Sequence, residues 1–138
     1  MLDLIIAALL AQTAPAPADP CNAADAAARS GCPRWRLVKR DTDHTTSLDP
    51  ASVVRADGGF WIVMRLVYSE TQANGSRSAL VRYRFECAAR TSVAVHVTLF
   101  DPAGIRLDDA AVPPRAARPN EPGTPSAAMT DEFCPSGG

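Results

Sequence analysis

The stretch Ser78–Ala88, SALVRYRFECA, decides the fold that this sequence predicts. Apolar and polar side chains alternate along it, which is typical of a β-strand with one buried face and one wet face. The buried side ends on a cysteine, so we expect the stretch to be both the middle of a sheet and one end of a disulfide. Val81, Tyr83, Phe85 and Cys87 lie on the buried side, and Leu80, Arg82, Arg84 and Glu86 lie on the wet side.

Two further long strands are expected, one before and one after this stretch. The run Phe60–Ser69, FWIVMRLVYS, is largely apolar on both faces, which is typical of a central or doubly covered strand. The run Ser92–Asp101, SVAVHVTLFD, is the third long strand. Three long strands joined by short polar loops predict an antiparallel meander. Within the third strand we expect Val93, Val95, Val97 and Leu99 on one side, and Ala94, His96, Thr98 and Phe100 on the other.

Shorter elements are expected before and after the meander. Arg34–Arg40 predicts a first strand, and Thr45–Asp49 predicts a second one that ends before a proline. Ala111–Pro122 is rich in Pro and Arg and is expected to be irregular. Thr124 is a helix N-cap residue followed by proline, so we expect a short helix over Ser126–Cys134. The predicted fold class is α+β: an antiparallel β-sheet meander of about five strands with a short C-terminal helix, stapled by disulfides.

The amino-terminal residues 1–18 are predicted to be a signal peptide. Leu4–Leu10 is a short apolar run, and Ala16–Ala18 supplies a small-x-small cleavage site. The segment contains Asp3 and lacks the usual Lys or Arg. One alternative is a buried helix. A transmembrane helix is a weaker alternative, because the run falls well short of about 20 residues.

The rest of the chain divides into three further segments. Residues 19–33 are expected to be a Pro/Ala-rich lead-in with a short helix, residues 34–134 the β-sheet domain, and residues 135–138 a disordered tail. We therefore predict no transmembrane span in the mature chain.

The four cysteines permit three pairings. We favour Cys21–Cys32 together with Cys87–Cys134, because the first two flank a short segment and the last two end a strand and the folded region. None of them forms a CxxC pair, so structural zinc and thioredoxin-like redox chemistry have little support. Disulfide-bonded cysteines agree with export.

The sequence contains no recognisable catalytic group. No serine lies in a GxSxG elbow, and His96 has no converging partners nearby in the sequence. His44 lies among Asp41, Asp43 and Thr45, which could loosely chelate a cation, but we favour a solvated turn there. We predict that the protein is not an enzyme and holds neither a cofactor nor a metal. Its 14 Lys+Arg and 15 Asp+Glu give a formal net charge of -1, which argues against nucleic acid or an anionic membrane as the partner.

The most interesting polar group is a set of arginines on the predicted sheet. Alternation places Arg82 and Arg84 on the wet face, near Arg65, where bidentate contacts suit an acidic protein or a sulfated glycan. The alternative is an ordinary wet sheet face. We expect both side chains to be solvated, so that replacing them leaves the fold intact. Trp35 and Trp61 are expected to be core residues and not a ligand platform.

The order of these features resembles the surface-adhesin protein E-like family over about residues 34–134. The shared pattern is a Trp-led strand, a short strand ending in Asp-Pro, a long apolar strand, a YxxxC strand, a strand closed by xxxG, and a Pro-Gly turn before the last Cys. The matching residues are Trp35, Asp49, Ser52, Trp61 to Tyr68, Tyr83 with Cys87, Phe100 with Gly104, and Pro122-Gly123-Thr124 with Cys134.

This resemblance implies an exported bacterial domain with an antiparallel sheet, a short helix and a Cys87–Cys134 disulfide. The namesake members bind host extracellular-matrix proteins. The chain departs from the family pattern in two places: it lacks a Trp often found before the Pro-Gly turn, and it adds the Cys21/Cys32 segment.

Two functional hypotheses follow from the sequence. The first is an exported, non-enzymatic binding module of the periplasm or cell surface, adhesin-like, with a protein or an acidic glycan as its partner. The second is a structural or accessory domain of the envelope that has no external ligand. An exposed Arg-rich or apolar patch would favour the first hypothesis, and an evenly mixed polar surface the second.

Overall fold

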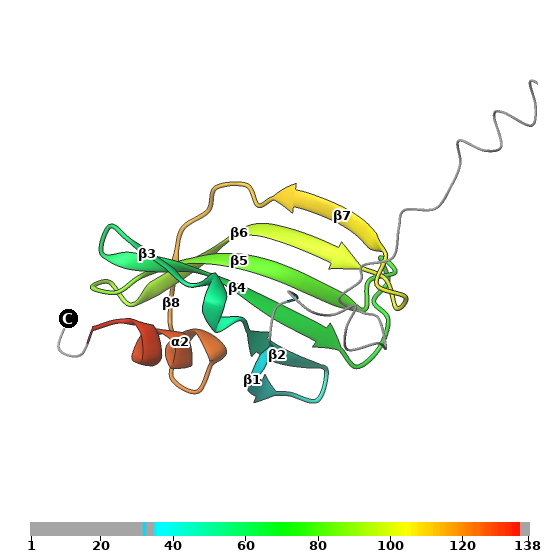
Figure 1. The fold of residues 1–138 in the computed structure, drawn as a ribbon, viewed down its shortest axis with the longest axis horizontal. Coiled ribbons are helices and arrows are strands. Elements are labelled where there is room, and N and C mark those ends of the chain that lie inside the picture. Colours follow the sequence, from blue (N-terminus) through cyan, green and yellow to red (C-terminus); the bar gives the residue numbers. More distant parts are fainter. Residues whose placement is uncertain (1–31, 33–34, 136–138) are drawn as a thin grey trace, which may run out of the picture.

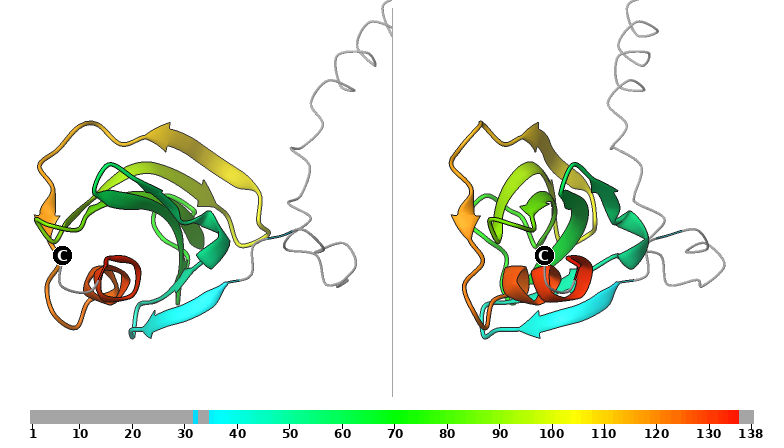
Figure 2. Two further views of the ribbon diagram at one scale, coloured as in Figure 1. Left: turned by 60° about the vertical axis from the view of Figure 1, so that its left-hand side comes forward. Right: turned by 90° about the vertical axis from the view of Figure 1, so that its left-hand side faces the viewer.

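The computed structural model describes Cys32 and residues 35–135, which form a curled antiparallel β-sheet and one short helix (Figure 1). The strands follow the order β1-β2-β4-β5-β6-β7, while β3 pairs with β4 and β8 pairs with β6. The sheet wraps around the helix α2 as an open half-barrel (Figure 2). The elements are β1 (Arg36–Arg40), β2 (His44–Leu48), the 3₁₀-helix η2 (Pro50–Ser52), β3 (Val54–Ala56), β4 (Gly59–Tyr68), β5 (Ser78–Glu86), β6 (Thr91–Phe100), β7 (Arg106–Ala111), β8 (Arg118–Pro119) and α2 (Pro125–Phe133).

The central meander is confirmed, but the predicted number of strands was wrong. The three long strands β4, β5 and β6 pair consecutively and antiparallel, as expected. The described residues form eight strands and not about five. Every residue of β7 is exposed, so this strand has no buried face that could produce an alternating pattern. The two-residue β8 contains Pro119, a residue that argues against a strand except at an edge.

The hydrophobic core lies between the concave face of the sheet and α2. Phe60 on β4 and Phe85 on β5 are directly opposite each other, and their rings stack with centroids 4.7 Å apart. Both are fully buried, and Phe133 of the helix tilts against Phe60 at 5.6 Å. The other buried members of this core are Leu48, Ile62, Met64, Cys87 and Met129.

A β-bulge changes the face of several β6 residues. The register pairs Arg82 with His96 but Tyr83 with Ala94, so Val95 is an extra residue. Val93 is therefore opposite Arg84 on the outer face, whereas Val97 is opposite Val81 on the inner face. The prediction that all four apolar residues of this strand share one side was wrong, because the period-2 pattern does not reveal a bulge.

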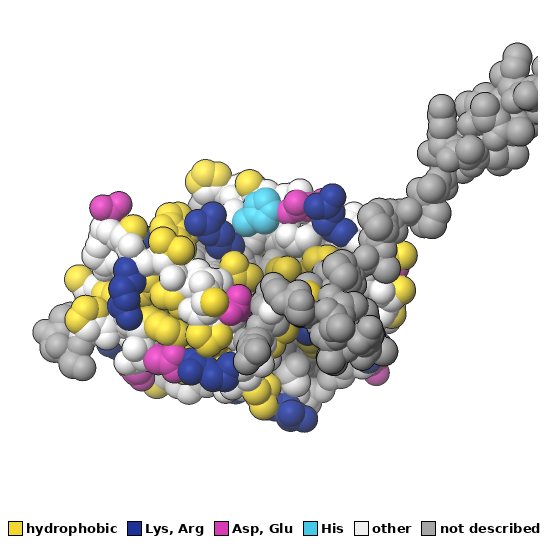
Figure 3. Space-filling view, viewed as in Figure 1, with side chains coloured by type: hydrophobic (Ala, Val, Ile, Leu, Met, Phe, Trp, Pro, Cys, Tyr) yellow, Lys and Arg dark blue, Asp and Glu magenta, His cyan; other side chains and the backbone are white. Residues whose placement is uncertain are grey.

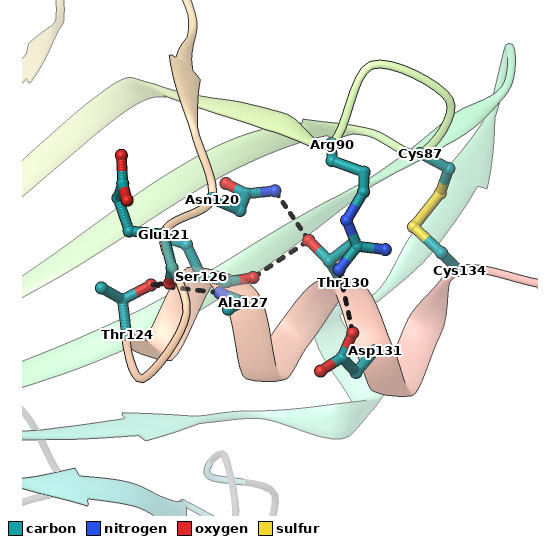
Figure 4. Close-up of polar contacts among 10 residues, drawn as sticks. All are labelled: Cys87, Arg90, Asn120, Glu121, Thr124, Ser126, Ala127, Thr130, Asp131 and Cys134. Atoms are coloured by element: carbon teal, nitrogen blue, oxygen red, sulfur yellow. Dashed lines mark hydrogen bonds and ion pairs between the residues drawn. A yellow bond between two sulfur atoms is a disulfide. The ribbon is translucent and has the colours of Figure 1, made fainter.

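The predicted helix is confirmed as α2, and so is its disulfide to the sheet. The Thr124 side chain accepts a hydrogen bond from the Ala127 backbone N–H at 3.3 Å, and a proline occupies the first turn. Cys134 follows the helix directly and is bonded to Cys87, with the two Cα atoms 5.6 Å apart (Figure 4).

Three arginines from different parts of the sheet hold the second half of α2. Arg36 of β1 pairs with Glu132, and Arg55 of β3 donates to the Phe133 carbonyl oxygen. Arg90 lies in the turn between β5 and β6, and its guanidinium is 3.0 Å from an oxygen of Asp131. Exposed ion pairs contribute only about 0–1 kcal/mol each. Their role is therefore to orient the helix more than to stabilise it.

A buried polar network joins the middle of α2 to the sheet. The Ser92 hydroxyl donates to the Asn120 side-chain oxygen, and the Asn120 amide donates to the Thr130 hydroxyl, both at 2.7 Å. The Thr130 hydroxyl in turn donates to the Ser126 carbonyl oxygen at 3.0 Å (Figure 4). Asn120 thus links β6, the segment after β8 and the helix, with its side-chain hydrogen bonds satisfied.

The predicted signal peptide, lead-in and tail lie outside the described residues, apart from Cys32 and Pro135. Cys32 is disulfide-bonded, and its predicted partner Cys21 also lies outside the described residues.

We predict that removing the Cys87–Cys134 bridge lowers the free energy of unfolding by about 4 kcal/mol, because the bridge closes a long loop of the unfolded chain. The double variant Cys87→Ser, Cys134→Ser leaves no unpaired thiol, and urea unfolding measures the loss. The matched control, Cys21→Ser with Cys32→Ser, is expected to lose about 3 kcal/mol, since the loop is shorter. Unchanged unfolding midpoints for the first double variant would contradict the prediction.

Candidate functional site

The convex face of the sheet carries the arginines that the sequence singled out. In the β4–β5 register, Trp61 is opposite Arg84, Val63 is opposite Arg82, and Arg65 is opposite Leu80. Because directly opposed residues of an antiparallel pair share a face, Arg65, Arg82 and Arg84 all lie on the face that turns away from α2. Apolar and basic side chains are interspersed on the side of the molecule seen in Figure 3.

Trp61 is the centre of this surface, and two arginines cover its ring. The guanidinium carbon of Arg82 lies 4.7 Å from the ring centroid, and that of Arg84 lies 5.3 Å away. At these distances the cations are attracted by the negative face of the indole. Arg65 lies similarly over Trp35, at 5.9 Å. We call Trp35, Trp61, Arg65, Arg82 and Arg84 the Trp-Arg face.

Both tryptophans lie outside the hydrophobic core, so the expectation that they are core residues was wrong. Trp61 stands between Phe60 and Ile62, which are both fully buried on the concave face. Strand geometry therefore turns Trp61 to the opposite face. The sequence could not assign the face of Trp61, because β4 is apolar on both sides.

The Arg84 side chain is fixed by hydrogen bonds to other groups of the protein. Its Nε donates to the Glu86 carboxylate at 2.9 Å, and a terminal nitrogen donates to the Asp57 carbonyl oxygen at 3.0 Å. Only 12% of its side chain is exposed. The expectation of a solvated side chain was therefore wrong for Arg84, whose contacts fasten the β3–β4 turn to β5.

Arg82 is the arginine of this face that remains available. It is exposed, and within residues 35–135 it makes neither a hydrogen bond nor an ion pair. In this part of the chain, its guanidinium stacks on Trp61. Arg65 likewise has only its ring contact with Trp35 among the described residues, and it is half-buried. The two guanidinium groups can still form bidentate hydrogen bonds to an acidic partner.

The histidines form pairs with neighbouring aspartates. His96 is directly opposite Arg82 on β5 and contacts Asp109 of β7, and this hydrogen bond, followed by one from Thr98, lowers the pKa of Asp109. The His44 Nδ1 lies 2.9 Å from an oxygen of Asp43. In the described part of the chain, no group of three or more His, Cys, Asp and Glu could hold a metal ion.

Two hollows beside α2 were not anticipated from the sequence. The larger, about 500 Å³, lies between β1 and the first turns of the helix and is lined by Lys39, Arg90 and Asn120, among others. The smaller, about 280 Å³, lies between the inner face of β5 and β6 and residues 115–121. The second was missed because its wall falls in the Pro/Arg-rich segment that was expected to be irregular.

The comparison with protein families gives a match that covers most of the chain. The family model described as surface-adhesin protein E matches residues 35–135, which span the sheet, the helix and the Cys87–Cys134 disulfide. No curated protein and no solved structure matches the chain. The matched range coincides with the resemblance inferred from the order of the sequence motifs.

We predict that the two stacked arginines differ in their effect on stability. Arg84→Glu should lower the free energy of unfolding by about 1–3 kcal/mol, because it removes two hydrogen bonds of a nearly buried cation. Arg82→Glu should change it by no more than about 1 kcal/mol, since only the stack on the half-buried Trp61 ring is lost. Urea unfolding of both variants measures the difference, and equal losses would contradict it.

Proposed function

Because the chain belongs to the surface-adhesin protein E family, we propose that it is an exported, non-enzymatic binding module of the bacterial cell envelope, placed in the periplasm or at the cell surface. The fold supports a binding role through a rigid sheet that presents one convex face. No helix in the described part of the chain is long and apolar enough to cross a membrane.

Disulfide chemistry supports export. The Cys87–Cys134 bridge ties the helix to the sheet, and Cys32 is disulfide-bonded as well. Structural disulfides form and persist in oxidising compartments and are rare in the cytosol. The proposed signal peptide over residues 1–18 supplies the route to such a compartment.

The Trp-Arg face is the proposed binding surface, and the observation that carries this assignment is the unpaired Arg82 beside Trp61. An exposed guanidinium next to a large aromatic ring offers charge, hydrogen-bond donors and apolar area in one place. Exposed Arg with Trp is also the composition that dominates binding energy in protein interfaces. The partner that fits is an acidic protein or a sulfated glycan.

A second candidate function is a structural or accessory envelope domain with no external ligand. The pairing of Arg84 with Asp57 and Glu86 favours it, because this arginine uses its donors to hold the sheet together. If every arginine of the face donated its hydrogen bonds to other groups of the protein, no guanidinium would remain to bind a ligand. The two functions therefore differ in whether the Arg82 guanidinium contributes to binding a partner.

We predict that Arg82→Glu weakens retention on immobilised heparin, used here as a sulfated-glycan probe, so that the variant elutes at a lower salt concentration than the wild type. Replacing a cation with an anion removes one bidentate contact and adds repulsion. Arg82→Lys keeps the charge but loses the planar fork, so it should be retained to an intermediate extent.

The matched control is Arg36→Glu, which makes the same charge change at an exposed arginine of β1 that faces α2, away from the Trp-Arg face. Its elution should stay close to that of the wild type. If Arg82→Glu and Arg36→Glu elute together, the retention reflects overall charge and the Trp-Arg face is not the binding surface.

We predict that mass spectrometry of the protein isolated from cells shows an amino terminus near Gln12 to Asp19, because the leader is removed at a small-residue site during export. The protein should be found in the periplasmic or outer-surface fraction. Recovery of intact Met1 from a soluble cytoplasmic fraction would contradict export, whatever the binding surface proves to be.

A further inference from the structure

The smaller hollow opens where the edge of the sheet is interrupted. β6 pairs with β7 through His96–Phe100 and with β8 through Thr91–Ser92. Residues 93–95 are outside both ladders, and the intervening segment leaves the sheet between β7 and β8 (Figure 1). The resulting hollow has a volume of about 280 Å³ and reaches the inner face of β5 and β6.

Both apolar and charged side chains line this hollow. Tyr83, Ala94 and Pro119 contribute apolar surface, while Arg115, Arg118 and Glu121 contribute charge. Within residues 35–135, these three charged side chains form no ion pair and no side-chain hydrogen bond. This contrasts with the arginines around α2, where Arg36, Arg55 and Arg90 each bind a group of the helix.

Tyr83 adds a hydrogen-bond donor in the hollow. It is half-buried against the core residue Phe85, with ring centroids 6.1 Å apart, and its hydroxyl makes no hydrogen bond within the described residues. Burial raises the pKa of Tyr83, a smaller contribution from Tyr68 acts in the same direction, and the nearby charge of Arg115 opposes them. The phenol therefore keeps its proton at neutral pH and can donate to an anion near Arg115.

We propose that this hollow is a binding site for a small organic monocarboxylate with an apolar body. Arg115 and Arg118 receive the carboxylate, because a guanidinium matches the two carboxylate oxygens in a bidentate arrangement. The apolar body contacts the Tyr83 ring and Pro119. The volume lies just below the usual range for ligand pockets, about 300–1,000 Å³, so the ligand is small.

The Glu121 carboxylate limits the negative charge of the ligand that the proposed site can bind. Two arginines and one glutamate leave one net positive charge at the rim, which suits a single carboxylate. A doubly charged sulfate or phosphate would meet the repulsion of the Glu121 carboxylate. Such an anion also lacks the apolar body that the Tyr83 and Pro119 walls would cover. The site should therefore prefer a carboxylate with a hydrocarbon part over an inorganic anion.

Titration of the full mature chain with 3-phenylpropanoate, followed by amide chemical shifts, tests this proposal. The shifts should change with saturation for residues around Ala94 and residues 115–121. Arg115→Gln and Arg118→Gln should each weaken the affinity by about tenfold or more, the loss expected when one charged hydrogen-bond partner is removed. Tyr83→Phe keeps the ring and should weaken it less.

Two controls separate this site from the Trp-Arg face and from simple anion binding. Arg82→Gln should leave the affinity for 3-phenylpropanoate unchanged, since Arg82 lies on the opposite face of β5. Sodium sulfate should cause little change in the wild type and a larger one in Glu121→Gln. No saturable shift at millimolar 3-phenylpropanoate would overturn the proposal, and so would equal affinities for the wild type and both arginine variants. Neither result bears on the Trp-Arg face.

Discussion

The closure of the half-barrel by α2 is the constraint on which the rest of the structure depends. The stacked Phe60 and Phe85 are fully buried because the helix covers the concave face with Met129 and Phe133. A nine-residue helix is unstable alone in water, because nucleation is unfavourable and few residues propagate it. The Cys87–Cys134 bridge fixes its carboxyl end, and the buried Asn120 network fixes its middle through Thr130. Removing either attachment would expose core surface, which makes helix docking and core formation a single event.

The same constraint determines which side chains lie on the outer surface, because successive residues of a strand point to opposite faces of the sheet. Since β4 and β5 direct their phenylalanines toward α2, their neighbours Trp61, Arg82 and Arg84 must point away from it. A large indole on a convex face would be costly to leave bare, and the two guanidinium groups cover it. Arg84 donates hydrogen bonds to Asp57 and Glu86, whereas Arg82 donates none within residues 35–135. The same stacking arrangement thus contains one structural arginine and one available arginine.

The sequence predicted those parts of the fold in which one face is buried. Alternation in Ser78–Ala88 and the Thr124 cap are local signals that burial and capping impose, whereas the Cys87–Cys134 pairing was inferred from the positions of the cysteines and from the family resemblance. The sequence did not predict β7 and β8, whose residues are exposed, because an edge strand with no buried side chains has no periodic pattern. The sequence also did not predict the bulge at Val95 or the face on which Trp61 lies, because both depend on pairing with a neighbouring strand. For the candidate site, the sequence placed the arginines on one face, but only the contacts distinguish Arg82 from Arg84.

The two proposed binding surfaces lie on opposite sides of the strand that organises the fold. On β5, Tyr83 points into the hollow, while Arg82 and Arg84 belong to the convex face. This strand pairs with a neighbour along both of its edges, so its backbone has little freedom to transmit a movement from one face to the other. Coupling between sites requires an element with two discrete arrangements that both ligands bias, and a doubly paired central strand does not provide one. The two surfaces are therefore expected to act independently, which lets substitutions on one face of β5 report on that face alone.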